Sequence, residues 1–252
     1  MTDLLASFAA AGGAPPASQE LVRVFRDGRV RALAGTAWPG LGRVDEAGAY
    51  AFELEAGALA ELERLAEAAA GEELDGPREP GSGRFALDVG DGARLRWDPF
   101  TTPPEPVAAL AGRLRALLVE AREHPLAAVR LELEAAAGDP LRLTYRFTAR
   151  GSEPLVLTVA SLRARVVEVD SEPSEPPPLA WVREAAPLVA GPAGPAELAP
   201  GESLTLEGAT SAPAGRLRVD GFARVKLGEI EATLGAGPAS PAPEGAGDGP
   251  AS

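Results

Sequence analysis

The chain of 252 residues has 24 basic and 37 acidic side chains, and its net charge of −13 argues against a phosphate backbone or an anionic membrane surface as partner. It has no cysteine, so disulfides, thiolate nucleophiles and Cys-based zinc sites are excluded. No apolar run reaches the roughly 18 residues that span a bilayer, and no basic residue precedes the short apolar patch at the N-terminus. We expect a cytoplasmic location, with secretion left open, and neither nucleic acid nor a membrane as partner.

The first half of the chain predicts two hairpins, a further strand and a helix. Alternating runs flank Asp27-Gly28 and Asp91-Gly92, residue pairs that are typical of tight hairpin turns. Between the hairpins, the segment 49–54 predicts a strand. The segment 57–71 places its leucines at helical spacing and ends at a glycine, which predicts a helix.

The segment 102–121 predicts the clearest helix of the chain. One continuous apolar stripe follows its helical period: Val107, Leu110, Ala111, Leu114, Leu117, Leu118 and Ala121. Thr102 and Glu105 have the spacing of a capping box, and Pro103 suits the first helical position because the missing N–H costs nothing there. We therefore expect the helix to begin at Pro103.

From about Val129 the hydrophobic period changes from 3.6 to 2. The run "LRLTYRFTARGSEPLVLTV" alternates cleanly, and further short runs follow it with turn-rich connections between them. In "LRARVVEV" the alternation breaks at Val166-Val167, which predicts a β-bulge there. The pattern favours an antiparallel β-sandwich with immunoglobulin-like topology.

The expected fold class is therefore α+β, a small two-layer α/β sandwich domain followed by an antiparallel immunoglobulin-like β-sandwich. We expect a flexible leader over 1–18, the α+β domain over 19–125, the β-sandwich over 126–234 and a disordered tail over 235–252. The leader and the tail are rich in small residues and proline, and they offer too little apolar surface to offset the entropy of ordering them.

The only histidine, His124, decides between catalysis and binding. It follows the apolar stripe and precedes Pro125, which pushes it out of the helical region. A histidine there also interacts favourably with the negative end of the helix dipole. We interpret His124 as a helix-end residue, which removes Ser-His-Asp hydrolysis and two-histidine metal sites. We predict no enzyme activity, no catalytic residue, no metal site and no cofactor. Carboxylate-only hydrolysis stays as a remote alternative that needs two close, buried carboxyl groups.

Two loops are candidates for recognition. "RWDPFTTPPEP" places Trp97 and Phe100 beside prolines, and rigid aromatic side chains on a stiff loop suit protein binding with little ordering cost. The alternative, which we favour, is that both rings close the core under the following helix. "DSEPSEPPPLAWVREAAP" carries Trp181 after a polyproline-prone run, which suits either a partner or an edge-strand crossover.

The order of the expected elements resembles two inhibitor families. Residues 20–123 are similar to emfourin, the protealysin-type metalloprotease inhibitor family, through "VFRDGRV", "LAELERLAEAA", "GRFALDVGDGARLRW" and "TTPPEPVAAL" in that order. The insertion "TAWPGLGRVDEAGAY" departs from that pattern. Residues 129–234 resemble bacterial sandwich domains of the intracellular proteinase inhibitor type through "LRLTYRFTARGSEPLVLTV" and "LAPGESLTLEG".

These resemblances imply a non-catalytic protein-binding protein that inhibits a protease by steric blockade of its cleft. Its partner would be a protein. The alternative is a structural or interaction module of a bacterial multiprotein assembly.

Overall fold

The computed structural model describes residues 3–11, 19–35, 45–74, 84–90, 92–168, 182–184, 195–210, 217–228 and 230–239. Within them the chain is mostly antiparallel β-sheet with two helices, in a sandwich-like arrangement. The predicted combination of antiparallel sheets with two helices, in a β-rich sandwich-like arrangement, is therefore confirmed at this coarse level.

The larger sheet has nine strands, which pair antiparallel throughout. They are β1 (Leu4–Ala11), β2 (Gln19–Phe25), β3 (Arg29–Ala34), β4 (Glu46–Glu53), β5 (Arg84–Val89), β6 (Ala93–Trp97), β7 (Pro125–Ala136), β8 (Leu141–Gly151) and β12 (Ser203–Thr210). Their spatial order is β12-β8-β7-β4-β3-β2-β1-β5-β6. Both predicted hairpins are present, as β2-β3 and β5-β6, and Gly28 supplies the positive φ of 86° that the first turn requires.

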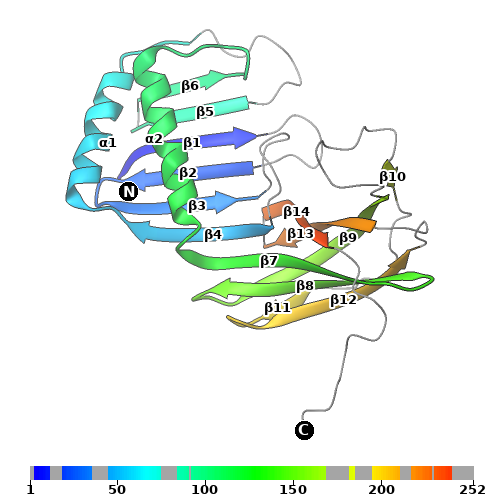
Figure 1. The fold of residues 1–252 in the computed structure, drawn as a ribbon. Coiled ribbons are helices and arrows are strands. Elements are labelled where there is room, and N and C mark those ends of the chain that lie inside the picture. The colour runs from blue at the N-terminus through cyan, green and yellow to red at the C-terminus, as the bar shows by residue number, and fades with distance from the viewer. Residues whose placement is uncertain are drawn as a thin grey trace.

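The smaller sheet packs against one end of the larger one (Figure 1). Its strands are β9 (Leu155–Glu168), β10 (Val182–Glu184), β11 (Ala196–Leu198), β13 (Leu217–Leu227) and β14 (Ile230–Ala239). The order is β10-β9-β13-β14, and β11 also pairs with β9. Large apolar residues of both sheets form the core between them; Leu131, Tyr145 and Phe147 of the larger sheet meet Leu157, Val225 and Leu234 of the smaller one.

The two helices, α1 (Ala56–Ala69) and α2 (Glu105–Ala121), cover one face of the larger sheet (Figure 1). The predicted apolar stripe of α2 is buried in full: Val107, Leu110, Ala111, Leu114, Leu117, Leu118 and Ala121. Below these side chains lie the alternate residues of the strands, such as Phe8, Val22 and Tyr50. The side chains at helical spacing on α2 and the alternate side chains of the strands thus pack together in one apolar layer.

The start of α2 corrects the capping prediction. The helix begins at Glu105 with Pro104 as its N-cap, and no side chain caps it. Because three of the four residues from 103 to 106 are proline, few backbone N–H groups at the helix start need a partner. The Thr102–Glu105 spacing therefore does not form a capping box.

The N-terminal stretch corrects the expectation of a flexible leader. Residues 4–11 form β1, which lies inside the sheet between β2 and β5. Leu5, Ala6 and Phe8 are buried there. Although many residues of β1 are small alanines, the strand is buried because both neighbouring strands and α2 cover it. The rest of the predicted leader lies outside the described residues, apart from Asp3.

The C-terminal part of the chain gives two further corrections. β14 extends to Ala239, so residues 235–239 of the expected disordered tail belong to a strand, in which Gly235, Ala236 and Ala239 pair with β13; residues 240–252 lie outside the described residues. The predicted bulge at Val166-Val167 is absent from the β9–β13 pairing, which stays in register there. The register instead shifts opposite Arg224 and Val225, where β9 has one extra residue at Ala160.

The larger sheet runs across the expected domain boundary at residue 125. β7 begins at Pro125 and pairs with β4 of the first half, from Glu46 opposite Arg130 to Tyr50 opposite Pro125. One continuous sheet therefore connects the helix-covered layer to the sandwich. The division of the chain into two domains stays a prediction.

Candidate functional site

His124 lies just beyond the end of α2, as the sequence predicts. Its backbone N–H donates to the carbonyl of Ala121 at 2.9 Å, and its carbonyl accepts from the N–H of Ala51 on β4 at 3.1 Å. The imidazole ring stacks on Phe52, with 5.2 Å between ring centroids and 21° between the ring planes. The side chain is exposed. His124 therefore fixes the turn between α2 and β7 against β4.

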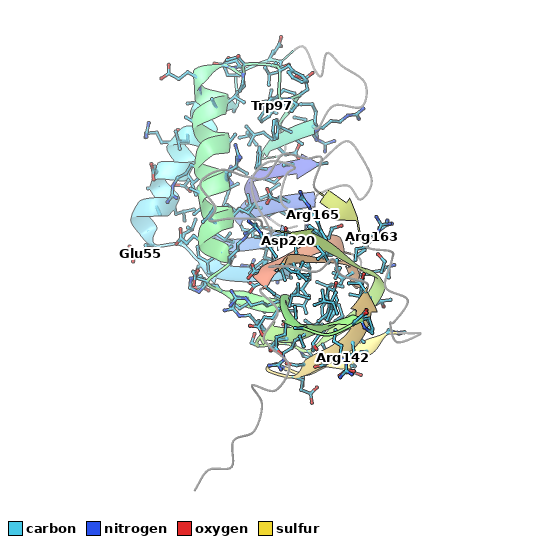
Figure 2. The ribbon with its side chains drawn as sticks, turned by 45° about the vertical axis from the view of Figure 1, so that its right-hand side comes forward. Glu55, Trp97, Arg142, Arg163, Arg165 and Asp220 are labelled. Atoms are coloured by element: carbon cyan, nitrogen blue, oxygen red, sulfur yellow. The ribbon has the colours of Figure 1, made fainter. Side chains whose placement is uncertain are left out.

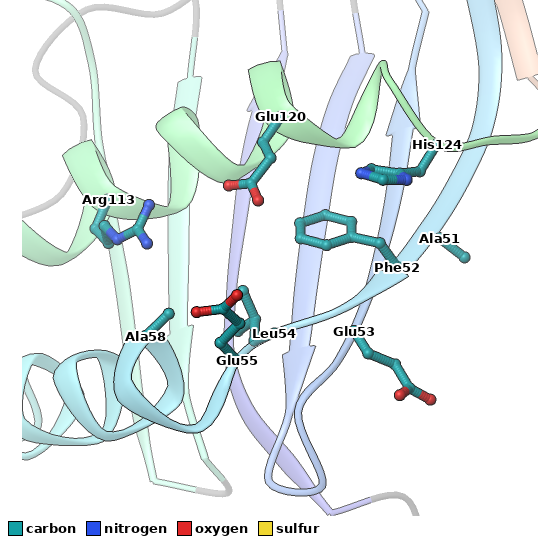
Figure 3. A pocket seen from close by; sticks show the side chains of 9 residues that line it. All are labelled: Ala51, Phe52, Glu53, Leu54, Glu55, Ala58, Arg113, Glu120 and His124. Atoms are coloured by element: carbon teal, nitrogen blue, oxygen red, sulfur yellow. The ribbon is translucent and has the colours of Figure 1, made fainter.

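The same ring lines a shallow surface pocket of about 520 Å³ between α2, β4 and the start of α1 (Figure 3). The residues around it are Ala51, Phe52, Glu53, Leu54, Glu55, Ala58, Arg113, Glu120 and His124. None of these described residues carries a hydroxyl or a thiol. The pocket thus offers His124 no serine to activate, which a hydrolytic triad would require.

The carboxylates of this pocket are not placed for acid–base catalysis. Glu53, Glu55 and Glu120 are all exposed, so none of them is a buried carboxyl group. The pocket's Arg113 pairs with Glu61 at 3.3 Å. In the described ranges, no group of three or more His, Asp or Glu side chains is close enough to hold a metal ion. A two-carboxylate hydrolase would need close, buried carboxyl groups, and this pocket does not meet that condition.

The loop from β6 to α2 presents the most exposed large apolar side chain of the described structure. Phe100 is 73% exposed. The side chain of Asp98 is buried and holds the loop from inside. Its Oδ1 accepts a hydrogen bond from the Phe100 N–H at 3.0 Å and from the Thr101 hydroxyl at 2.8 Å. The N–H of Thr101 also donates to the Asp98 carbonyl at 3.1 Å. An Asx-type turn therefore fixes the backbone that carries Phe100.

The three residues named as protein-binding candidates separate in the structure. Trp97 is only 5% exposed; it lies near the start of α2 (Figure 2) and packs on Phe8 and Phe85, with ring centroids 6.2 and 5.6 Å away. This corrects the guess that Trp97 contacts a partner and agrees with the core alternative for this ring. Phe100 points outward, against that alternative. Trp181 lies outside the described residues.

The role of Asp98 was not predicted, although a signal for it exists. An aspartate followed two and three residues later by free N–H and hydroxyl donors is typical of an Asx turn. What the sequence does not reveal is that this aspartate is fully buried while the phenylalanine beside it is exposed.

Comparison with known proteins found no relative of this chain. No protein-family model matches the chain, and neither the curated proteins nor the solved structures give a significant match. Among the described helices, none combines the length and the apolar character needed to cross a bilayer.

Proposed function

We propose that this protein is a non-catalytic protein-binding protein, and that it inhibits a protease by steric blockade of the cleft. The observation that carries the proposal is the exposed ring of Phe100 on a loop that buried Asp98 holds in shape. The proline-rich segment that follows leads directly into α2 and adds stiffness.

The energetic reason is preorganisation. An aromatic side chain that is exposed in the free protein gains a large buried area on binding, and aromatic residues are enriched among those that dominate interface energies. Because hydrogen bonds already order the Asp98–Thr101 turn, its binding costs less conformational entropy than that of a flexible loop. This combination suits insertion into a concave partner surface such as a protease cleft.

Two resemblances support an inhibitor over other binding proteins. Residues 20–123 resemble emfourin, and residues 129–234 resemble sandwich domains of the intracellular proteinase inhibitor type, for which we propose immunoglobulin-like topology. The hairpins and helices of the first half occur in the order that the emfourin resemblance implies. β1, which precedes them, is an additional element.

A structural or interaction module is the second candidate, and the edge of the larger sheet favours it. Within the described strands, β12 pairs on one side only, with β8. Such an edge can accept an extended segment of another protein through main-chain hydrogen bonds. Capture of partners from the source cells discriminates the candidates, because the inhibitor proposal requires a protease among them.

Titration of the purified protein against thermolysin-like and subtilisin-like proteases tests the proposal. We expect stoichiometric inhibition of at least one class at micromolar concentration and a large loss of inhibition in Phe100→Ala. The matched control is Val119→Ala, which removes a side chain that is 70% exposed and lies about 20 Å from the start of α2. Failure of the wild type to inhibit either class would remove the protease version of the proposal.

A further inference from the structure

The face of the larger sheet that lies opposite the helices carries an excess of arginine. On β1, β2, β3, β5 and β6, alternate residues face α1 and α2 in the apolar core, so the intervening residues point to the other side. On that side six arginines are exposed: Arg23, Arg29, Arg31, Arg84, Arg94 and Arg96. We call this set of residues the arginine face.

The register of the strands brings these side chains into adjacent rows. Ser7 of β1 lies opposite Arg23 of β2, which lies opposite Arg31 of β3. In the other direction, Ser7 lies opposite Asp88 of β5, which lies opposite Arg94 of β6. Neighbouring strands are about 4.8 Å apart, so this row places Arg23 and Arg31 next to each other on one side of Ser7, and Asp88 and Arg94 next to each other on the other side.

Few acidic groups on the described strands compensate this face, and Glu53 of β4, opposite Arg29, is one of them. Asp88 binds Arg96 at 2.9 Å, and Arg29 is engaged by Asp27 in the hairpin turn at 2.7 Å. For the other four arginines, no carboxylate among the described residues lies within 4.0 Å. The face is therefore locally basic, although the whole chain has a net charge of −13.

Arg23 and Arg31 are the centre of this excess. Like charges directly opposite each other on neighbouring strands destabilise a sheet. An uncharged ligand would not relieve the repulsion between the two guanidinium groups, whereas carboxylates placed between them would. Guanidinium groups bind carboxylates in bidentate geometry, which makes arginine better suited than lysine to this task.

We propose that the arginine face binds an acidic polypeptide segment of the partner protein. This proposal rests on the proposed function, because it assumes that the partner is a protein. β6 supplies Arg94 and Arg96 and leads directly into the Phe100 loop, so the two contact regions are continuous along the chain. The loop supplies apolar contact, and the face supplies charge complementarity.

The charge distribution favours a short acidic segment over other anionic partners. Screening limits the reach of a surface charge to about 8 Å at physiological salt, so a short peptide on this face meets mainly its arginines. A nucleic acid extends beyond the face and meets the remaining acidic surface. The only aromatic ring on the same strand positions, Phe25, already has Arg29 over it at 5.4 Å, which leaves little described surface for base stacking.

The test uses fluorescence anisotropy with three labelled probes: a peptide alternating glutamate and glycine, its lysine counterpart, and a single-stranded oligonucleotide. We expect the glutamate peptide alone to bind, with an affinity that falls as salt is added. In the double variant Arg23→Gln, Arg31→Gln, its affinity drops about tenfold, since two exposed ion pairs together contribute about that factor. The variant's unfolding midpoint rises, because the like-charge pair is gone, so loss of the fold does not explain weaker binding.

The control is the double variant Arg142→Gln, Arg146→Gln on β8. It makes the same change of net charge on the opposite face of the same sheet, in the sandwich part of the molecule, where Figure 2 shows Arg142. It leaves peptide affinity unchanged if the arginine face is the site. Equal loss in both double variants, tighter binding of the oligonucleotide, or no binding of the glutamate peptide by the wild type would each overturn the inference.

Two further measurements separate the alternatives. Sedimentation of the wild type reports whether a second copy occupies the face; self-association that the Arg23, Arg31 variant abolishes would overturn the assignment to a partner protein. The Val119→Ala variant retains the arginine face and should bind the glutamate peptide normally. Peptide binding without protease inhibition contradicts the inhibitor proposal and leaves this inference intact.

Discussion

The carboxylate of Glu46 on β4 accepts a hydrogen bond from the guanidinium of Arg150 on β8, two strands away in the sheet and 104 positions later in the chain. Arg130 of β7, between them, lies 3.3 Å from the same carboxylate, and the Tyr50 hydroxyl donates to its other oxygen at 3.2 Å. Only 6% of the Glu46 side chain is exposed. This cluster joins the helix-covered layer to the sandwich.

Glu46→Gln should lower the free energy of unfolding by about 2 kcal/mol, because hydrogen bonds to a buried charged group are lost while two arginines stay in place. Urea denaturation measures the change. Glu132→Gln, on an exposed position of β7, is the control and should change stability by less than about 0.5 kcal/mol. A similar small effect at Glu46 would show that the cluster contributes nothing to the joint.

Two glycines in different settings should respond to alanine in opposite directions. Gly151 ends β8 with a φ of 116°, and a Cβ at this position would clash with the carbonyl oxygen of Leu126. Gly151→Ala should therefore destabilise the protein, by about 2 kcal/mol or more. Gly112 lies on the exposed side of α2 with nothing near its Cβ position, so Gly112→Ala should stabilise by up to about 1 kcal/mol. Thermal unfolding of both variants checks the sign of each change.

Asp98→Ala should lower the free energy of unfolding by about 1–3 kcal/mol, because it removes a buried acceptor of two hydrogen bonds. It should also weaken partner binding without touching the Phe100 ring, because the loop loses its fixed shape. Asp98→Asn keeps an oxygen acceptor and should retain most of the affinity. If Asp98→Ala inhibits as well as the wild type, the loop's preorganisation has no part in binding.

Stability should fall in alkali. Burial, and then the nearby Glu46 carboxylate, raises the pKa of Tyr50, and burial raises the pKa of Tyr145. Below the unfolded value of about 10, both states keep the phenolic protons, and the stabilisation is complete. As the pH rises from that value through the higher native pKa, the unfolded chain releases the protons first and the native state loses stability. The expected slope is about 1.4 kcal/mol per pH unit for each tyrosine.

Urea titrations at several alkaline pH values measure this loss. Tyr50→Phe should reduce the slope above pH of about 10 by half, because one of the two tyrosines of the chain is removed. A tyrosinate absorbance change that precedes unfolding would show instead that the phenols ionise in the native state.

The sequence predicted the elements whose pattern depends on local burial. The stripe of α2 has the 3.6-residue period of a helix that covers a sheet, and the Asp27-Gly28 turn needs only local geometry, so both could be identified. β1 was missed because its alanines acquire their burial from strands distant in sequence. The β4–β7 pairing was missed for a related reason: a change of period at Val129 says nothing about which strand pairs with the first one after it.

The residues of the candidate site could likewise be predicted only where local sequence determines their position. The composition singled out His124, and its position before Pro125 placed it correctly at the end of a helix. Trp97 and Phe100 are three positions apart, and no local pattern says that one ring enters the core while the other leaves it. That distinction depends on Asp98, whose burial is a property of the packed molecule.

Whether the Phe100 loop contacts the protease is decided by the inhibition constant of Phe100→Ala, measured beside those of the wild type and Val119→Ala against the inhibited protease. We expect Phe100→Ala to inhibit about 30-fold more weakly, the effect of losing about 2 kcal/mol at an aromatic contact, and Val119→Ala to inhibit like the wild type. Inhibition constants that are equal for all three proteins would contradict the assignment of the Phe100 loop as the contact element.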